Sequence, residues 1–263
     1  RSAAKGAEAV ESIRAKVPAA DIRFEQVDLA SLASVAAFGE RLRGQRTSLD
    51  LLINNAGVMN PPERRETSDR FELQFGTNYL GHFALTAALL PLLRNGNRPR
   101  VVTLSSIAAR SGAIDFDDLN AERDYKPMPV YSQSKLACLM FAFELQRQSD
   151  ARGWGLASLA AHPGITATDL IVNGAGRFSL SGILRRLLPF LFSPAWQGAL
   201  PTLYAATSPE AKPGAYYGPS RMGETRGYPA LAKAPQQALD EQVAARLWME
   251  SERLTGGVFA AGH

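Results

Sequence analysis

Short apolar runs alternate with amphipathic stretches along almost the whole chain, and this alternation restricts the fold more than any other feature. Such an order is typical of parallel strands joined by crossover helices. Because the runs are almost continuously apolar, the strands should be buried on both faces. We therefore predict an α/β fold with a doubly wound, Rossmann-like parallel sheet. The expected strands lie at 22–27, 49–54, 100–105, 155–161 and 215–217, and the expected helices at roughly 3–17, 31–44, 67–94, 131–150, 195–207 and 235–250.

The organisation of the chain points to one domain over residues 1–263. With 263 residues, of which 46% are hydrophobic, the chain has ample material for one large core. Pro and Gly punctuate the predicted elements, and we find no repeat, low-complexity tract or linker that would divide the chain.

Composition excludes several classes of function. Cys138 is the single cysteine, and no apolar run reaches membrane-spanning length, so a cytoplasmic protein is expected. The net charge of +4 comes from scattered basic residues without interleaved aromatics, which argues against nucleic-acid binding. His82 and His162 have no partner at metal-ligand spacing, so no metal site is predicted. A serine-hydrolase nucleophile elbow is also absent.

Polar residues gather at the carboxyl ends of the predicted strands, where α/β sheets bind ligands. The strand ends read VDLAS (27–31), NNAG (54–57), LSS (104–106) and AHPG (161–164). Each can be explained as turn chemistry, and Asp28 or Ser31 as a helix cap. Their occurrence at four strand ends favours a ligand site.

Tyr131 and Lys135 stand four residues apart at the start of a predicted helix, so both can face one crevice. A nearby ammonium lowers the pKa of a tyrosine and makes it useful for proton transfer at neutral pH. Ser106, at a strand end, can orient a substrate carbonyl. Proton donor, tuning cation and orienting hydroxyl suit carbonyl reduction, for which the hydride must come from a cofactor. The alternative is a solvent-exposed pair on an amphipathic helix.

Together with these residues, NNAG, FGTNYLGHF (75–83), VVTLSS, YSQSK and HPGITAT (162–168) make the chain resemble the short-chain dehydrogenase/reductase family. The long step from Ser106 to Tyr131, with DFDDLNAERDYKPMPV (115–130), YYGP (216–219) and ARLWMESERLTG (245–256), resembles the branch of retinol dehydrogenases and WW-domain-containing oxidoreductases. The resemblance covers nearly the whole chain.

The resemblance implies the catalytic roles. Tyr131 would be the acid/base, Lys135 its tuner and a ligand of the nicotinamide ribose, and Ser106 the substrate-orienting hydroxyl. Asn78 would anchor a proton-relay water. Ser105 is not chosen, because adjacent strand residues face opposite sides.

The resemblance also implies the cofactor contacts. Asp28 and Leu29 would meet the adenine, and Asn54, Ala56 and Gly57 the adenosine side of the cleft. Pro163, Gly164, Ile165 and Thr168 would meet the nicotinamide carboxamide. The cofactor would be NADP, on the strength of Arg1, which resembles the arginine that pairs with the 2′-phosphate; NAD stays open, as does a merely solvated Arg1.

One departure from the family pattern concerns the phosphate-binding glycine turn, which this sequence lacks. In the 3-2-1-4-5-6 strand order the missing unit would lie between 22–27 and 49–54, leaving the first expected strand without a neighbour. We therefore expect the doubly wound sheet to lack its first β-α-β unit here, with roughly 40 further residues at the amino end of the natural protein.

The function expected from the resemblance is hydride transfer between NADP(H) and a small apolar alcohol or carbonyl. The alternative is a catalytically silent NAD(P)-binding regulatory or partner-binding protein. Residues 170–210 would hold a substrate lid. Within them, FSLSGILRRLLPFLF (178–192) fits an apolar cap, a membrane contact or a helix covering the core. The family pattern also suggests a homodimer through the helices at 67–94 and 131–150.

Overall fold

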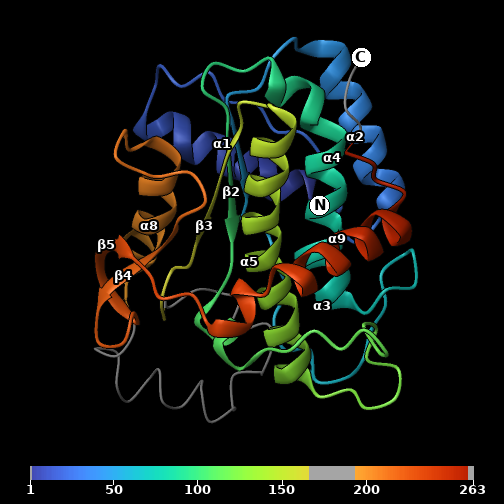
Figure 1. The fold of residues 1–263 in the computed structure, drawn as a ribbon. Coiled ribbons are helices and arrows are strands. Elements are labelled where there is room, and N and C mark those ends of the chain that lie inside the picture. Colours follow the sequence, from blue (N-terminus) through green and yellow to red (C-terminus); the bar gives the residue numbers. More distant parts are fainter. Residues whose placement is uncertain (1, 166–192, 260–263) are drawn as a thin grey trace.

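A single five-stranded sheet organises the protein in the computed structural model, which describes residues 2–165 and 193–259. The strands, in their order across the sheet, are β1 (Leu51–Asn54), β2 (Arg100–Leu104), β3 (Ala157–Ala161), β4 (Tyr216–Arg221) and β5 (Arg226–Leu231). The first four are parallel, and β5 pairs antiparallel with β4 (Figure 1). The parallel sheet is confirmed. The sequence did not predict β5, because RGYPAL contains Gly and Pro where an apolar run was sought.

Helices cover both faces of this sheet, as a doubly wound fold requires. On one face α4 (Gly81–Arg94) and α5 (Pro127–Arg152) pack in the larger core, and α2 (Leu32–Gln45) lies against α4. On the other face α8 (Ala195–Thr207) joins a smaller core with Val102, Leu159 and Tyr217. Layers on both faces explain why the central strands are apolar on both sides.

The C-terminal helix α9 (Glu241–Thr255) crosses in front of α5 and α4 (Figure 1). Its Trp248 and the later Phe259 join an aromatic cluster around Phe83, with ring centroids 5.1 Å and 5.0 Å from the Phe83 ring. Phe141 of α5 completes this contact, 5.5 Å from Phe83. The parts of α4 and α5 under this cluster are therefore covered within the chain, and the expected homodimer, which stays a prediction, would need other surfaces of these helices.

The amino-terminal part differs most from the sequence-based expectation. Helix α1 (Ala3–Lys16) forms as predicted but contains no buried residue. The strand predicted at 22–27 is wrong: these residues have no regular secondary structure and are largely exposed. A strand needs a hydrogen-bonding neighbour. Within the described residues the sheet has no strand beyond β1, so this apolar run has nothing to pair with.

The long helix predicted at 67–94 is interrupted. Residues 67–72 are not helical, α3 (Leu73–Phe75) leads into a π-turn, η1 (Gly76–Leu80), and only then does α4 begin. Other predicted helices extend or split: α5 starts four residues early at Pro127, and the predicted 235–250 helix is a short 3-10 turn, η4 (Gln236–Leu239), followed by α9. In the described part of the chain no helix combines the length and apolarity that crossing a bilayer requires.

Candidate active site

Lys135 of α5 is buried against the carboxyl end of β2. One turn after Tyr131 on α5, its Nζ donates to the Leu104 carbonyl at the end of β2, at 3.1 Å. The same Nζ lies 6.0 Å from the centroid of the Tyr131 ring. Both side chains are 5% exposed. The alternative of a solvent-exposed pair is therefore excluded, and the i, i+4 spacing places tyrosine and ammonium in one buried region.

The two serines after β2 have different environments. Ser105 is buried, and its Oγ donates to the Lys135 carbonyl at 2.7 Å, which fastens the strand end to α5. Ser106 begins a 3-10 turn, η2 (Ile107–Ser111), and its Oγ accepts from the Ala108 N–H at 3.2 Å. With its oxygen receiving that bond, the Ser106 hydroxyl keeps its proton to donate.

Asn78 lies in the π-turn η1 and is fully buried. Its amide oxygen accepts from the Val58 N–H at 2.7 Å, and its Nδ2 donates to the Val58 carbonyl at 2.9 Å and to Ser134 Oγ at 3.0 Å. π-Turns are frequent at functional sites because they re-aim the helix locally. Asn78 thus clamps the loop after β1 to α5, a structural role that the sequence reading did not assign.

The main-chain carbonyl of Asn78 also has partners. His82 Nδ1 donates to it at 2.8 Å and Cys138 Sγ at 3.1 Å. Burial lowers the pKa of His82 to about 4 and raises the pKa of Cys138, so imidazole and thiol are both neutral donors here. These contacts give both side chains a structural role. The water-anchoring role of Asn78 stays a prediction.

Asn54 and Gly57 shape the loop after β1. A Cβ on Gly57 would stand 3.0 Å from Asn78 Oδ1 and 3.6 Å from Lys135 Nζ, so the backbone passes close to both. Asn54 is buried, and its Nδ2 donates to Thr86 Oγ1 at 3.1 Å, while its Oδ1 has no partner among the described residues. Ala56, between them, is exposed.

The segment after β3 holds Pro163, Gly164 and Ile165. Gly164 has φ +72°, and a Cβ there would stand 2.3 Å from the Thr225 carbonyl, so two separate reasons require glycine. The Ile165 N–H donates to the same carbonyl at 2.9 Å. The turn between β4 and β5 therefore fixes this segment. Thr168, and most of the predicted lid at 170–210, lie outside the described residues.

The residues predicted to meet the adenine, Asp28 and Leu29, lie in the turn just before α2. The Asp28 carboxylate accepts from the Ala30 N–H at 3.0 Å, and the main-chain N–H of Asp28 donates to Ser34 Oγ. These two bonds hold a tight turn before α2. Leu29 is part of the larger core. Its carbonyl packs closely against α4, because a Cβ on Gly81 would stand only 2.4 Å from it. Arg1 lies outside the described residues.

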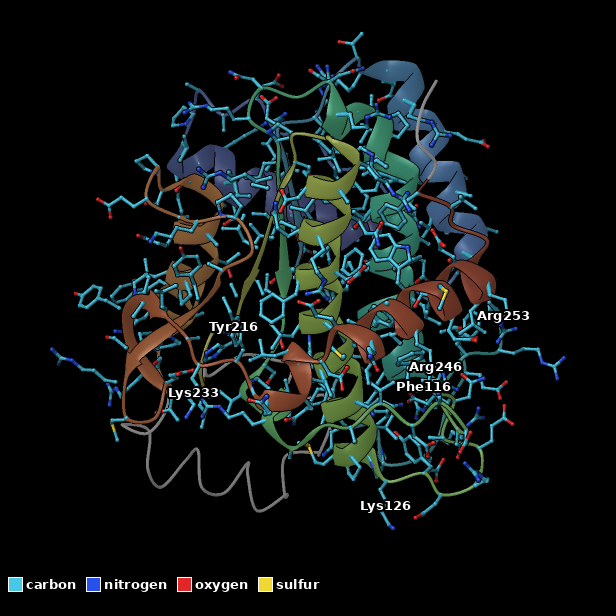
Figure 2. The ribbon with its side chains drawn as sticks, viewed as in Figure 1. Phe116, Lys126, Tyr216, Lys233, Arg246 and Arg253 are labelled. Atoms are coloured by element: carbon cyan, nitrogen blue, oxygen red, sulfur yellow. The ribbon has the colours of Figure 1, made fainter. Side chains whose placement is uncertain are left out.

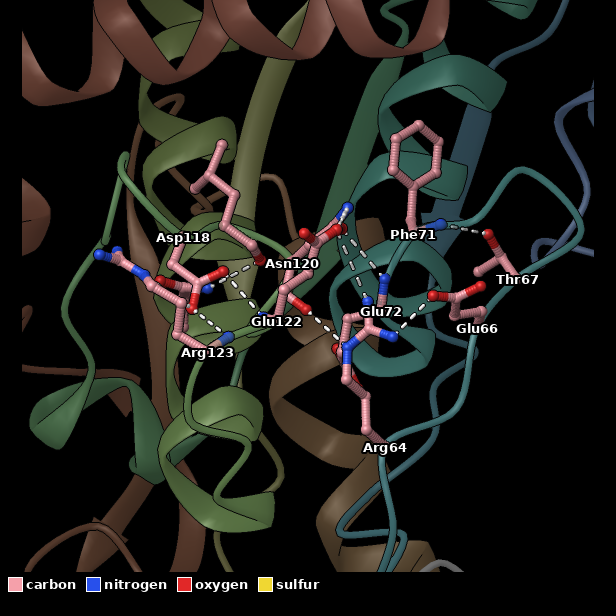
Figure 3. A network of polar contacts seen from close by, with 11 residues as sticks. Arg64, Glu66, Thr67, Phe71, Glu72, Asp118, Asn120, Glu122 and Arg123 are labelled. Carbon is pink, nitrogen blue, oxygen red and sulfur yellow. Dashed lines mark hydrogen bonds and ion pairs between the residues drawn. The ribbon is translucent and has the colours of Figure 1, made fainter.

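The long step between Ser106 and Tyr131 is held by polar contacts to the loop before α3 (Figure 3). Arg64 Nε donates to the Asn120 carbonyl at 3.1 Å, and the Glu72 N–H donates to Asn120 Oδ1 at 3.1 Å. On its other side, Arg246 of α9 lies over the Phe116 ring at 3.9 Å (Figure 2). The segment between Ser106 and Tyr131 is thus held in place beside the start of α5. The sequence motifs did not predict these contacts.

Comparison with known proteins agrees with this arrangement. The family model described as short chain dehydrogenase matches residues 1–175. The chain belongs to the short-chain dehydrogenase family. As a member of it, the protein is an NAD(P)-dependent dehydrogenase acting on alcohols. Among the described residues no group of His, Cys, Asp or Glu is placed to hold a metal ion.

Similar proteins belong to the retinol dehydrogenase-like branch. Polyprenol dehydrogenase of Mus musculus is 40% identical over 96% of this chain and 73% of its own length. Retinol dehydrogenase 13 of Mus musculus is 39% identical over 97% of this chain and 74% of its own length. The crystal structure of an uncharacterized protein from Mycobacterium paratuberculosis is 37% identical, with a TM-score of 0.75, over 95% of this chain and 81% of that one.

A more distant structure shows the fold alone. The short chain dehydrogenase from Burkholderia cenocepacia, solved in complex with NADP, is 20% identical, with a TM-score of 0.57, over 81% of each chain.

Proposed function

We propose that the protein transfers a hydride between NADP(H) and an apolar alcohol or carbonyl compound, with Tyr131 as the acid/base. The observation that carries the proposal is the buried Lys135 ammonium, held by the Leu104 carbonyl beside the Tyr131 ring. Burying a cation costs free energy, which an opposite charge or hydrogen bonds can offset. A Tyr131 phenolate formed during proton transfer would be that opposite charge.

The residues present fit the nicotinamide half of a dinucleotide. A Cβ on Gly57 would stand 3.6 Å from Lys135 Nζ, so the missing side chain leaves space beside the lysine, whereas Gly164 lets the segment after β3 pack against the Thr225 carbonyl. When bound, the dinucleotide supplies or accepts the hydride that no side chain can provide. Lys135 and the segment Pro163–Ile165 would hold its nicotinamide half, and the turn with Asn54, Ala56 and Gly57 would shape the cleft on its adenosine side. Asp28 and Leu29 would meet the adenine, and the glycine turn for the pyrophosphate is not among the residues described.

The chemistry of the protein's own groups follows from their contacts. Ser106 would donate its hydroxyl proton to the substrate oxygen and fix that oxygen near Tyr131, because its own oxygen already accepts the Ala108 N–H. Tyr131 would give its proton to the developing alkoxide in reduction, or take it in oxidation. Lys135 would stabilise the phenolate that remains, since opposite charges attract strongly in a buried site.

The choice of cofactor and the class of substrate rest on separate observations. The preference for NADP depends on Arg1, and NAD would suit the same nicotinamide contacts. An apolar substrate is supported by relatives named for retinol and polyprenol. Membrane contact by 178–192 and a cytoplasmic location stay predictions, as does the homodimer.

The test is steady-state kinetics of the full-length protein with NADPH and a panel of apolar aldehydes, repeated with Tyr131→Phe. We expect the variant to lose roughly 10²- to 10⁴-fold in kcat, because the proton donor is gone. Tyr228→Phe on β5, where the side chain is 65% exposed, is the matched control and should keep full activity. Turnover that survives in Tyr131→Phe would refute the mechanism. Binding of NADPH without turnover of any substrate would favour the silent regulatory protein instead.

A further inference from the structure

His162 directly follows β3 and is fully buried, yet the proposed chemistry does not use it. Its ring lies 5.1 Å from the Tyr216 ring, and a Cβ on Gly218 would stand 2.0 Å from its Nε2. Glycine in YYGP is therefore required by this imidazole. The protein therefore packs closely around the two ring nitrogens of His162.

The hydrogen bonds of His162 fix its tautomer. Nδ1 lies 3.2 Å from the Gly164 nitrogen, whose N–H can only donate, so Nδ1 must accept and carry no proton. Nε2 lies 3.1 Å from Glu224 Oε2 and must therefore hold the proton and donate it. Burial keeps the pKa of His162 well below its ordinary value, and Arg110 adds to this while Glu224 opposes it. Neutral His162 thus connects Gly164, in the segment expected to meet the nicotinamide, with Glu224.

Glu224 extends the bridge to the loop after Ser106. Its Oε2 also accepts from Arg110 Nη2 at 2.7 Å, and its Oε1 accepts from the Lys233 N–H at 2.9 Å. Arg110 belongs to η2, the turn that begins at Ser106. Its Nη1 donates to the Gly223 carbonyl at 3.1 Å. Tyr216 and Lys233, which flank this network, are labelled in Figure 2.

The backbone of the β4–β5 turn is unusual in the same place. Met222 and Glu224 both have positive φ, 53° and 68°, which is uncommon for residues other than glycine. Such a conformation persists only where the surroundings hold it. Here Arg110 and His162 hold Glu224, and the Thr225 carbonyl receives the Ile165 N–H.

The geometry points to Glu224 as a positioning residue for the proposed dehydrogenase reaction. Through Arg110, Glu224 fixes the loop of Ser106, and through neutral His162 it fixes Gly164. One carboxylate therefore sets the spacing between the Ser106 hydroxyl, which would orient the substrate, and the segment Pro163–Ile165, which would meet the nicotinamide. Glu224 does not touch the reacting atoms. Protonation of His162 at Nδ1 would break its bond to Gly164, so cofactor binding should weaken in acid. Tyr216, Glu224 and Arg110 are the titratable or charged groups that face this imidazole.

The inference rests on the proposed function, but its first test needs no turnover. Hydrogen exchange of the Gly164 and Ile165 amides should become about tenfold faster in Glu224→Gln, which loses charged hydrogen bonds to Arg110 and His162. Glu250→Gln is the matched control, because it makes the same change in an exposed ion pair with Arg253 on α9. Nitrogen NMR of the His162 ring at neutral pH should show a protonated Nε2. A protonated Nδ1, or unchanged exchange in folded Glu224→Gln, would overturn the inference.

The second test separates positioning from general stabilisation. In Glu224→Gln the KM for NADPH should rise about tenfold while kcat changes far less, because a charged hydrogen bond behind the cofactor segment is lost. Arg110→Ala should have a similar effect, Arg110→Lys a smaller one, and the double variant with Glu224→Gln no more than either alone. Additive losses, or a lower thermal midpoint with unchanged KM, would contradict positioning. If the wild type turns over no aldehyde, the proposed function fails, while the exchange experiment still decides the inference.

Discussion

Helices α1 and α4 have the same length, 14 residues, but α1 lies exposed on the surface whereas α4 is mostly buried. Helix α1 has no buried residue; it begins at a capping residue, Ser2, whose Oγ accepts from the Lys5 N–H at 3.3 Å. Helix α4 has no side-chain cap, continues directly from a π-turn and tolerates Pro91, yet most of its residues are buried. Local signals define the first helix, and packing defines the second.

This difference shows where the candidate site gets its order. Asn78 lies just before α4, and Tyr131 and Lys135 lie on the helix that packs beside it. The residues of the candidate site are therefore held in place by the larger core, whereas the segment with α1 adds little to the stability of that core. Substitutions in the two regions, together with a change of pH, test this difference.

The largest effect should come from Phe83→Ala in α4. Phe83 is fully buried against the rings of Tyr79, Phe141, Trp248 and Phe259. Removing a buried phenylalanine costs about 3–5 kcal/mol, from lost burial and from the cavity left behind. Urea unfolding should show this loss. A cost below about 1 kcal/mol would mean that the aromatic cluster closes around the cavity or contributes little.

Asn78→Ala should come next, with a loss of roughly 3 kcal/mol, because it leaves both polar groups of Val58 and the Ser134 hydroxyl without their partner. Asn95→Ala is a matched control: the side chain of this exposed asparagine makes a single hydrogen bond to the described residues, from Nδ2 to the Thr47 carbonyl. The control should cost well under about 1 kcal/mol. Equal losses for the two variants, measured by urea unfolding, would show that the π-turn does not need its clamp.

Acid should weaken the fold through His82, whose pKa burial lowers to about 4 from 6.5. Above pH 6.5 both the folded and the unfolded chain hold a neutral imidazole, so no stability is lost. Between pH 6.5 and 4 the unfolded chain binds a proton and the folded one does not, so up to about 3 kcal/mol is lost as pH falls. His82→Gln should flatten this part of the unfolding profile. An unchanged slope would place the acid sensitivity elsewhere, for example at His162.

The smallest effect should come from α1. Ile13→Ala removes a side chain that is already 40% exposed, so the free energy of unfolding should change by less than about 0.5 kcal/mol. Ser2→Ala should speed hydrogen exchange at the start of α1 through loss of the cap, again without changing global stability. A global loss comparable to that of Phe83→Ala would show that α1 packs more firmly than its exposure indicates.

Much of the sheet and the central chemical pair could be predicted from sequence. Apolar runs identified β1 to β4, and helical spacing put Tyr131 and Lys135 on one side of α5, because these patterns repeat with the local backbone period. The run at 22–27 has the same local character as the true strands, yet it is not a strand. Hydrogen-bond pairing, unlike apolar patterning, requires a second segment.

The α/β order, the position of helix α1 and the residue types that proton transfer at Tyr131 needs could be read from the sequence. The bond from Ser105 to Lys135, the clamp of Asn78 between Val58 and Ser134, and the contacts of Glu224 with Arg110 and His162 are seen only in the folded protein. The physical reason is one of range. Propensity and periodicity act within a few residues, whereas these bonds join residues that are 20 to 114 positions apart and meet only when the sheet brings its strand ends together.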